Sequence, residues 1–302
     1  MRPVLAVLAA ALCFSTTGTA QAVAGVDASP IAVGAARIAV GGGILGLLAL
    51  AQTRRAPRPP AAGPRGTTIL LVALGVTGVL AYQPLFFAGT RDNGVAVGTV
   101  VALGSAPIAT GLVDAVRLRR APPPRWTAAT AVALTGVALV SGVTGGAVAL
   151  SPAGLLASAG AGVSYALYTI GGKSLIERGW TSTRVMGTAF GIAALASVPL
   201  LVASGTAWLA TPNGAALAVW LGVVTTAVAY LLFGWGLARL SAVTVSTLTL
   251  AEPLAATVLG LLALHEHLTP VSAAGLALLA LGLALVSVPS RRREAPDATS
   301  PA

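Results

Sequence analysis

The stretch Val243–Leu264, VTVSTLTLAEPLAATVLGLLAL, decides how the rest of the chain is interpreted. It is apolar and long enough to cross the hydrocarbon core of a bilayer, which takes about 20 helical residues. Glu252 and Pro253 nevertheless stand in its middle. At about 1.5 Å per residue, Glu252 lies roughly 14 Å from the start of the segment, near the midplane of a core about 30 Å thick.

A carboxyl group at that depth is costly, about 2.5–3.5 kcal/mol on insertion scales, so Glu252 is first interpreted as a functional residue. The alternative is a neutral Glu252 that is hydrogen-bonded inside a helix bundle. Pro253 has no N–H group and is expected to leave the Thr249 carbonyl without its helical donor, which favours a kink. Pro253 is therefore a predicted hinge.

The composition predicts an integral membrane protein. Of the 302 residues, 56% are hydrophobic and only 9% are charged, too few charges for a water-facing surface. The net charge of +10 sits in short loops between apolar segments, without interleaved aromatic residues, so no nucleic-acid partner is predicted. The partner that this composition requires is the lipid bilayer.

Ten apolar segments are near or above the lower limit of about 17 residues for a spanning helix. We expect an all-α fold, because isolated spanning segments must satisfy their backbone groups internally. The segments are 4–24, 31–51, 67–88, 94–116, 127–143, 153–172, 185–204, 215–236, 243–264 and 271–288.

The distribution of basic residues predicts the orientation. With the N-terminus inside, every lysine and arginine except Arg37 and Arg91 falls at a cytoplasmic end. The positive-inside rule therefore predicts a multi-pass protein of the inner (plasma) membrane with both termini in the cytoplasm.

The first segment also resembles a secretory signal peptide. We expect it to be retained as a helix, with cleavage as the alternative.

The chain contains two related halves. Leu80-Ala81-Tyr82 recurs as Val228-Ala229-Tyr230, Ala106-Pro107 aligns with Glu252-Pro253, and 136–141 aligns with 282–287. Units with an odd number of helices insert in opposite orientations, so we predict two inverted five-helix repeats, 1–146 and 147–290, followed by a short basic, disordered cytoplasmic tail, 291–302. Inverted repeats around a midplane site are typical of secondary transporters. Pro107 is the second predicted hinge.

At this point the chain resembles the drug/metabolite transporter superfamily, in the form with two EamA-like domains. The resemblance rests on an ordered set of motifs: Arg37, Ala81-Tyr82, Ser105-Ala106-Pro107, 164–169, Leu250-Ala251-Glu252-Pro253 with Glu266, and the glycine-bearing last segment. Phe14-Ser15 and His265 depart from the family pattern. The resemblance implies a ten-helix exporter of amino acids, related metabolites or drugs.

Five residues are predicted to bind the substrate or an ion. Glu252 is the proton- or cation-responsive group. Arg37 lies roughly 9 Å inside its segment, where it could snorkel to the interface or pair with a substrate carboxylate or with Glu252. Ser15, Thr16 and Tyr82 are the preferred pocket-lining residues, although hydroxyls inside spans usually bond helix to helix.

Other polar and small residues have simpler interpretations. Asp114 is expected to pair with Arg117, one turn further along the helix. The pairs Gly42/Gly46 and Gly94/Gly98 are expected to form close-packing faces. The motif His265-Glu266-His267 is a weak metal site, so capping or gating at the outer end of its segment is favoured. We predict no metal and no cofactor.

The predicted function is secondary transport of a small molecule. The spans contain no catalytic triad and the chain has no nucleotide-binding loop, so neither an enzyme nor an ATP-driven pump is expected. The favoured activity is export of small metabolites such as amino acids. The alternatives are multidrug efflux and a non-transporting scaffold or sensor. Substrate identity, direction, coupling ion and oligomeric state, a homodimer included, stay open.

Overall fold

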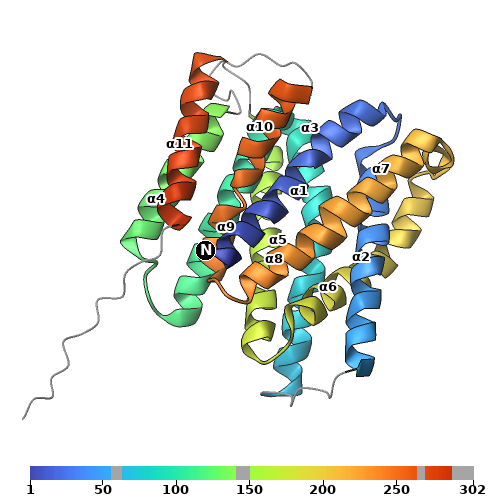
Figure 1. Cartoon of the computed structure of the whole chain (residues 1–302), viewed down its shortest axis with the longest axis horizontal. Coiled ribbons are helices and arrows are strands. Elements are labelled where there is room, and N and C mark those ends of the chain that lie inside the picture. Colours follow the sequence, from blue (N-terminus) through green and yellow to red (C-terminus); the bar gives the residue numbers. More distant parts are fainter. Residues whose placement is uncertain (56–62, 141–149, 264–268, 288–302) are drawn as a thin grey trace, which may run out of the picture.

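The computed structural model describes residues 1–55, 63–140, 150–263 and 269–287. The predicted tail 291–302 and the motif His265-Glu266-His267 lie outside this part of the chain. The described residues form a helical bundle (Figure 1), whose α-helices are α1 (Arg2–Ala24), α2 (Pro30–Arg55), α3 (Arg65–Leu118), α4 (Pro124–Val140), α5 (Pro152–Glu177), α6 (Ser182–Ala203), α7 (Pro212–Gly222), α8 (Ala229–Leu237), α9 (Ala242–Leu248), α10 (Ala251–Ala263) and α11 (Pro270–Ser287).

Two short elements complete the described chain. The 3₁₀ helix η2 (Ala207–Ala210) precedes α7, and the π-helical turn η3 (Val223–Val228) joins α7 to α8 in one span. Within the described ranges, nine apolar helical segments of at least 18 residues could each cross a membrane. The tenth predicted span is α4, whose 17 residues lie at the lower limit of a spanning helix. The all-α prediction is confirmed.

The long helix α3 contains two predicted spans. Its dihedral angles leave the helical range at Gly94, where φ is 80° and ψ is 157°. Only glycine adopts such a φ at little cost, and an added Cβ there would meet no atom within 4 Å. The prediction that Gly94 belongs to a close-packing face is therefore wrong: Gly94 is the break between the two spans. Gly98 does pack closely, against the Thr90 backbone.

Helices α2 and α6, which correspond in the two repeats, pack side by side and run antiparallel. On α2 and α6, a Cβ on Gly42 would meet the Phe190 carbonyl oxygen, and a Cβ on Gly187 would meet the Leu45 carbonyl oxygen. Residue numbers therefore rise along α2 as they fall along α6. The Gly42/Gly46 prediction is confirmed, because Gly46 also packs against Gly191 of α6.

The pair α4 and α11 shows the same relationship. Gly136 packs against Leu279, and Gly282 packs against Ala133. At the offset of 146 residues between the repeats, Ala133 corresponds to Leu279 and Gly136 corresponds to Gly282. Exchanging the two halves therefore turns the Gly136–Leu279 contact into the Gly282–Ala133 contact. The fold is thus an all-α membrane bundle of two inverted five-helix repeats.

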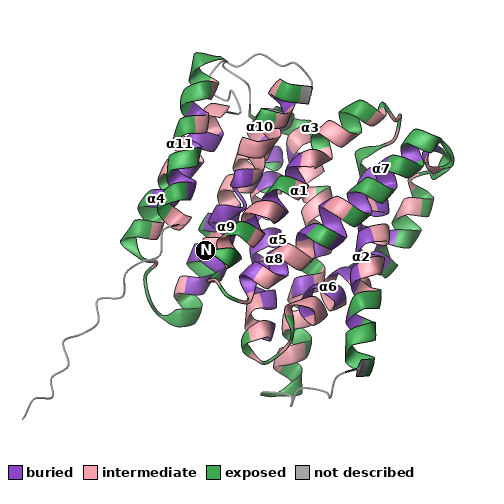
Figure 2. Ribbon diagram, in the orientation of Figure 1, coloured by how far each residue is buried: buried purple, intermediate pink, exposed green. Residues whose placement is uncertain are grey.

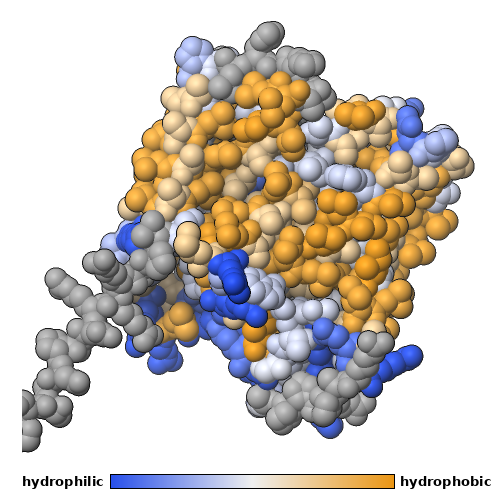
Figure 3. All heavy atoms as spheres, in the orientation of Figure 1, coloured by the Kyte–Doolittle hydropathy of each residue, from blue (hydrophilic) through white to orange (hydrophobic). Residues whose placement is uncertain are grey.

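The remaining helices of each repeat also pack against helices of the other repeat. Helix α5 packs against both halves of α3, while α1 packs against α8, α9 and α10. Buried residues gather on the inner faces of these helices (Figure 2). On the face seen in Figure 3, apolar atoms cover most of the bundle and hydrophilic atoms gather along its lower rim.

The predicted ion pair at the end of α3 is confirmed. Arg117 Nη2 and Asp114 Oδ1 lie 3.1 Å apart. Arg117 also reaches Glu177 Oε2 on α5 at 2.8 Å, which ties the second half of α3 to the end of α5.

Candidate functional site

A cavity of about 70 Å³ lies between helices of both repeats. The first repeat contributes side chains from α1, α2 and α3, and the second contributes side chains from α5, α6, α8, α9 and α10. The lining residues combine one carboxyl group, one guanidinium group, hydroxyl groups and six aromatic rings: Phe14, Arg37, Ile38, Val79, Tyr82, Gln83, Ala102, Leu103, Ala106, Tyr165, Tyr168, Phe190, Tyr230, Ser246, Thr249, Leu250 and Glu252.

Glu252 lines this cavity from the first turn of α10. The helix is interrupted directly before it, since α9 ends at Leu248 and α10 begins at Ala251. Across the interruption the Glu252 N–H donates to the Thr249 carbonyl oxygen at 2.9 Å. As expected, Pro253 cannot give the Thr249 carbonyl its ordinary i to i+4 donor, and the chain tightens there to this i to i+3 bond instead.

The position of Glu252 also places its side chain in the field of a helix end. Backbone N–H groups at the start of a helix carry a partial positive charge, which favours a negative group nearby. The interruption thus puts the carboxyl of Glu252 at a helix N-terminus inside the bundle.

Arg37 lines the same cavity from α2. Its guanidinium bonds inside the bundle and does not snorkel to the interface. Its Nε donates to Thr226 Oγ1 at 3.0 Å, and its Nη2 donates to the Thr225 carbonyl oxygen at 2.9 Å. Like Glu252, it lines this cavity. The structure therefore brings the two strongest sequence candidates to one cavity.

The segment that receives Arg37 is the π-helical turn η3. The Thr225 hydroxyl donates to the Leu221 carbonyl oxygen at 2.8 Å, and the Thr226 hydroxyl donates to the same oxygen at 2.9 Å. Hydroxyls that bond back to a preceding carbonyl compete with the backbone ladder and distort helices. Such π turns are frequent at functional sites.

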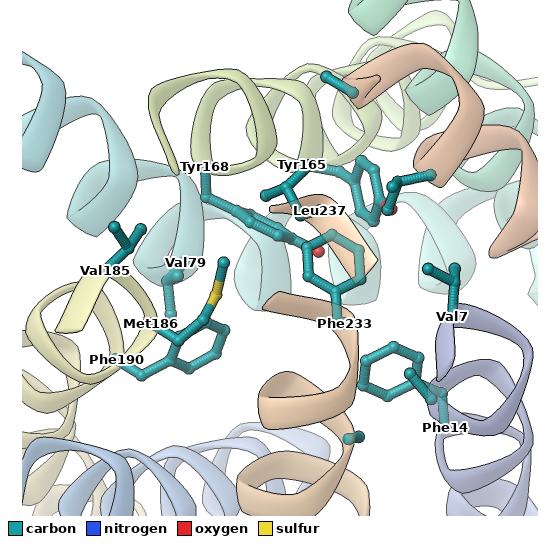
Figure 4. Packing of buried hydrophobic residues seen from close by; sticks show 14 of the residues in the cluster. Val7, Phe14, Val79, Tyr165, Tyr168, Val185, Met186, Phe190, Phe233 and Leu237 are labelled. Atoms are coloured by element: carbon teal, nitrogen blue, oxygen red, sulfur yellow. The ribbon is translucent and has the colours of Figure 1, made fainter. Parts of the chain in front are cut away.

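Aromatic rings make up much of the remaining cavity lining, and Figure 4 shows four of them, Phe14, Tyr165, Tyr168 and Phe190, within the buried core. Tyr230 is central: its ring centroid lies 4.0 Å from that of Phe190 and 5.1 Å from that of Phe14. The Tyr168 and Tyr230 hydroxyl oxygens are 3.4 Å apart. Tyr82, one of the predicted residues, lines the cavity from α3.

The other predicted residues do not line this cavity. The Ser15 hydroxyl donates to the Leu12 carbonyl oxygen at 2.8 Å within α1. Thr16 accepts a hydrogen bond from Trp220 Nε1 at 3.1 Å, so it links α1 to α7. Both hydroxyls thus bond within or between helices. Pro107 follows the cavity residue Ala106 on a stretch of α3 that stays helical.

Most of the lining residues were not among the predicted site residues, and two of these, Tyr165 and Thr249, contact each other. Tyr165 belongs to the quoted motif 164–169, and its hydroxyl oxygen lies 2.9 Å from Thr249 Oγ1. Thr249 is one helical turn before Glu252, a spacing that places both on one face of a helix. That spacing was the available sequence signal, whereas nothing in the sequence pointed to Thr225 and Thr226.

The chain matches the EamA-like transporter family over residues 1–142 and 152–288, which is most of its length. The chain belongs to this family, within the drug/metabolite transporter superfamily.

The similar proteins agree with this assignment. One is an uncharacterized transporter, YwfM, of Bacillus subtilis, with 38% identity over 97% of this chain and 96% of its own length. Another is a probable terminal-alkyne amino-acid exporter of Streptantibioticus cattleyicolor, with 30% identity over 90% of this chain and 87% of its own. A crystal structure of 22% sequence identity has the same fold, with a TM-score of 0.78 over 97% of this chain and 99% of that chain.

Family membership settles the class of the protein. Members of the EamA-like family are transporters rather than enzymes, so the EamA-like chain has a small-molecule substrate and a lipid environment. The spanning helices make it a multi-pass membrane protein.

Proposed function

We propose that this EamA-like protein exports small zwitterionic metabolites such as amino acids by alternating access. One observation carries the proposal: a carboxyl group, Glu252, and a guanidinium group, Arg37, line one cavity between the two repeats. A substrate with an ammonium and a carboxylate group finds a partner of opposite charge for each. Charge-assisted hydrogen bonds of this kind are the strong ones.

The pairing of charges favours amino acids over cationic drugs. An aromatic cavity with Glu252 alone would suit a lipophilic cation, since aromatic faces and carboxylates both attract positive charge. Arg37 works against such a ligand by repulsion. The relative named as a probable amino-acid exporter supports the same choice.

The size of the cavity supports a mechanism in which the helices move. Pockets for small molecules usually measure about 300–1,000 Å³. The cavity of about 70 Å³ is therefore too small for a metabolite until the repeats separate. The interruption before Glu252 provides a place for that motion, and Pro253 and Pro107 are the proposed hinges. The scaffold alternative gives no reason for charged groups around a cavity between the repeats.

Coupling and orientation complete the proposal. Glu252 takes up a proton or cation in one facing state and releases it in the other.

The protein lies in the inner membrane with both termini in the cytoplasm, as the basic residues predict. The boundary of the repeats at 146/147 falls between the two family segments, 1–142 and 152–288.

Transport by the purified protein in liposomes tests the proposal. Vesicles preloaded with unlabelled substrate are diluted into a labelled panel of neutral amino acids and of lipophilic cations, with protein-free vesicles as the control. We expect counterflow of amino acids and none of cations. Counterflow of cations alone would make the protein a drug exporter, and no counterflow with any compound would favour the scaffold.

A further inference from the structure

A second hollow lies between α2 and α6, separate from the candidate substrate cavity. This groove has a volume of about 670 Å³. Its sides include Leu47, Leu50 and Leu195, which are 68%, 58% and 75% exposed and hence face the surroundings of the bundle. Gly43 lies in the groove, and a Cβ added there would meet no atom within 4 Å. The missing side chain thus leaves open space at the surface.

One end of the groove is polar and positively charged. The Arg184 guanidinium lies 3.9 Å from the centre of the Trp180 ring, and both residues line the groove together with Thr53. Close by, the Thr181 hydroxyl donates to Gln52 Oε1 at 3.1 Å and joins the ends of the two helices. Helix α6 begins at Ser182, so its positive N-terminus adds to the charge of Arg184.

The length of the groove suits one acyl chain. From Arg184 to Val198 the wall formed by α6 extends roughly 21 Å, at about 1.5 Å per residue. One leaflet of the hydrocarbon core is about 15 Å thick, half of the roughly 30 Å of the whole core. A chain whose headgroup stays at the Arg184 end can therefore lie in the groove along its whole length.

We propose that this groove is a binding site for an anionic phospholipid. The phosphate lies at Arg184 and the α6 N-terminus, Trp180 supports the headgroup, and one acyl chain fills the space above Gly43. Charge complementarity decides the class of lipid, because basic pockets between spanning helices select anionic headgroups. This site is additional to the proposed transport function and does not depend on it.

Native mass spectrometry of the delipidated protein tests the proposal, with phosphatidylglycerol and phosphatidylcholine of identical acyl chains as probes. Arg184→Gln is the test variant. Arg239→Gln is the matched control, because Arg239 also stacks on a tryptophan, Trp235, at 3.9 Å but does not line the groove. Arg184→Lys retains the charge, and Gly43→Leu places a side chain in the groove where a Cβ meets no atom within 4 Å.

The wild type is expected to retain one phosphatidylglycerol about fivefold better than phosphatidylcholine, the order expected for one basic residue at a membrane surface. Arg184→Gln loses this preference, while Arg184→Lys and Arg239→Gln keep it. Gly43→Leu retains less of both lipids. The proposal is overturned if the wild type shows no preference, if Arg184→Gln behaves like the wild type, or if Gly43→Leu releases no lipid. A dimer that Gly43→Leu dissociates would instead identify the groove as an interface between two copies.

Discussion

Arg37 of the first repeat is hydrogen-bonded to the π-helical turn of the second repeat, with its Nη2 2.9 Å from the Thr225 carbonyl oxygen. The same guanidinium donates from Nε to Thr226 Oγ1 at 3.0 Å. These bonds hold the only charged donor on the described cavity wall in a fixed place beside the aromatic rings. The planar guanidinium therefore joins α2 to η3, and in the proposed function it also binds the substrate carboxylate.

Replacing Arg37 by lysine separates charge from geometry. Lysine keeps the positive charge but cannot reproduce two bonds in the plane of a guanidinium. We expect Arg37→Lys to lower the free energy of unfolding by about 1.5–3 kcal/mol, the value of one hydrogen bond to a charged group, and to reduce amino-acid counterflow at least tenfold. Thermal unfolding and liposome counterflow measure the two effects. Arg91→Lys is the control, because Arg91 is exposed and contacts Asp92. Equal behaviour of the two variants would argue against this role of Arg37.

Glu252→Gln tests the proposed coupling. The amide matches a neutral carboxyl group in shape but cannot take up or release a proton. We expect the variant to fold normally and to continue exchange of substrate, while net export no longer depends on pH. The measurement is flux across a range of pH values, with Glu177→Gln as a control at the surface ion pair with Arg117. An unchanged pH profile in Glu252→Gln would make Glu252 structural.

Glu252→Ala addresses stability instead. We expect removal of the carboxyl group to leave a polar group of the cavity without a partner, and an unsatisfied buried polar group costs about 1–3 kcal/mol. We expect a lower unfolding temperature than for Glu252→Gln. If both variants unfold at the same temperature as the wild type, the carboxyl group has no stabilising contact in the bundle.

The close contact of α4 and α11 predicts a sharp difference between two glycines. A Cβ on Gly136 would meet the Leu279 backbone nitrogen, whereas a Cβ on Gly43 would meet nothing within 4 Å. We expect Gly136→Ala to destabilise the protein by about 1–3 kcal/mol through overpacking. Gly43→Ala, in contrast, is expected to be neutral or stabilising because alanine favours a helix. Thermal unfolding in one detergent compares them, and equal stabilities would contradict the described packing.

Cysteine labelling tests the orientation. In a Cys13→Ser background, Arg91→Cys and Arg120→Cys place one thiol at each predicted side of the membrane. An impermeant maleimide added to intact cells should label position 91 and leave position 120 unmodified until the cells are opened, and a reporter fused at Ala302 should be active only in the cytoplasm. Labelling at position 120 in intact cells would reverse the predicted topology.

Much of the fold follows from the sequence, because a bilayer imposes few choices. Apolar segments of spanning length must be helices, so the number and approximate limits of the spans can be derived from composition alone. The inverted repeat was also visible, since Gly136 and Gly282 occur at the spacing that their packing against Leu279 and Ala133 requires. The midplane position of Glu252 identified it as a candidate, because an ionisable group there is costly.

Only the tertiary structure decided which residues share the cavity and how the backbone departs from regular helix. The meeting of Arg37 with Thr225 joins residues 188 positions apart, and no local pattern encodes such a contact. Likewise, the residue types suggested that Ser15 lines the pocket and that Gly94 lies on a close-packing face. In the structure, Ser15 bonds to its own helix and Gly94 breaks α3. Hydroxyl and glycine residues serve equally in packing, in sites and in breaks. Their role depends on the atoms that face them, which the fold alone determines.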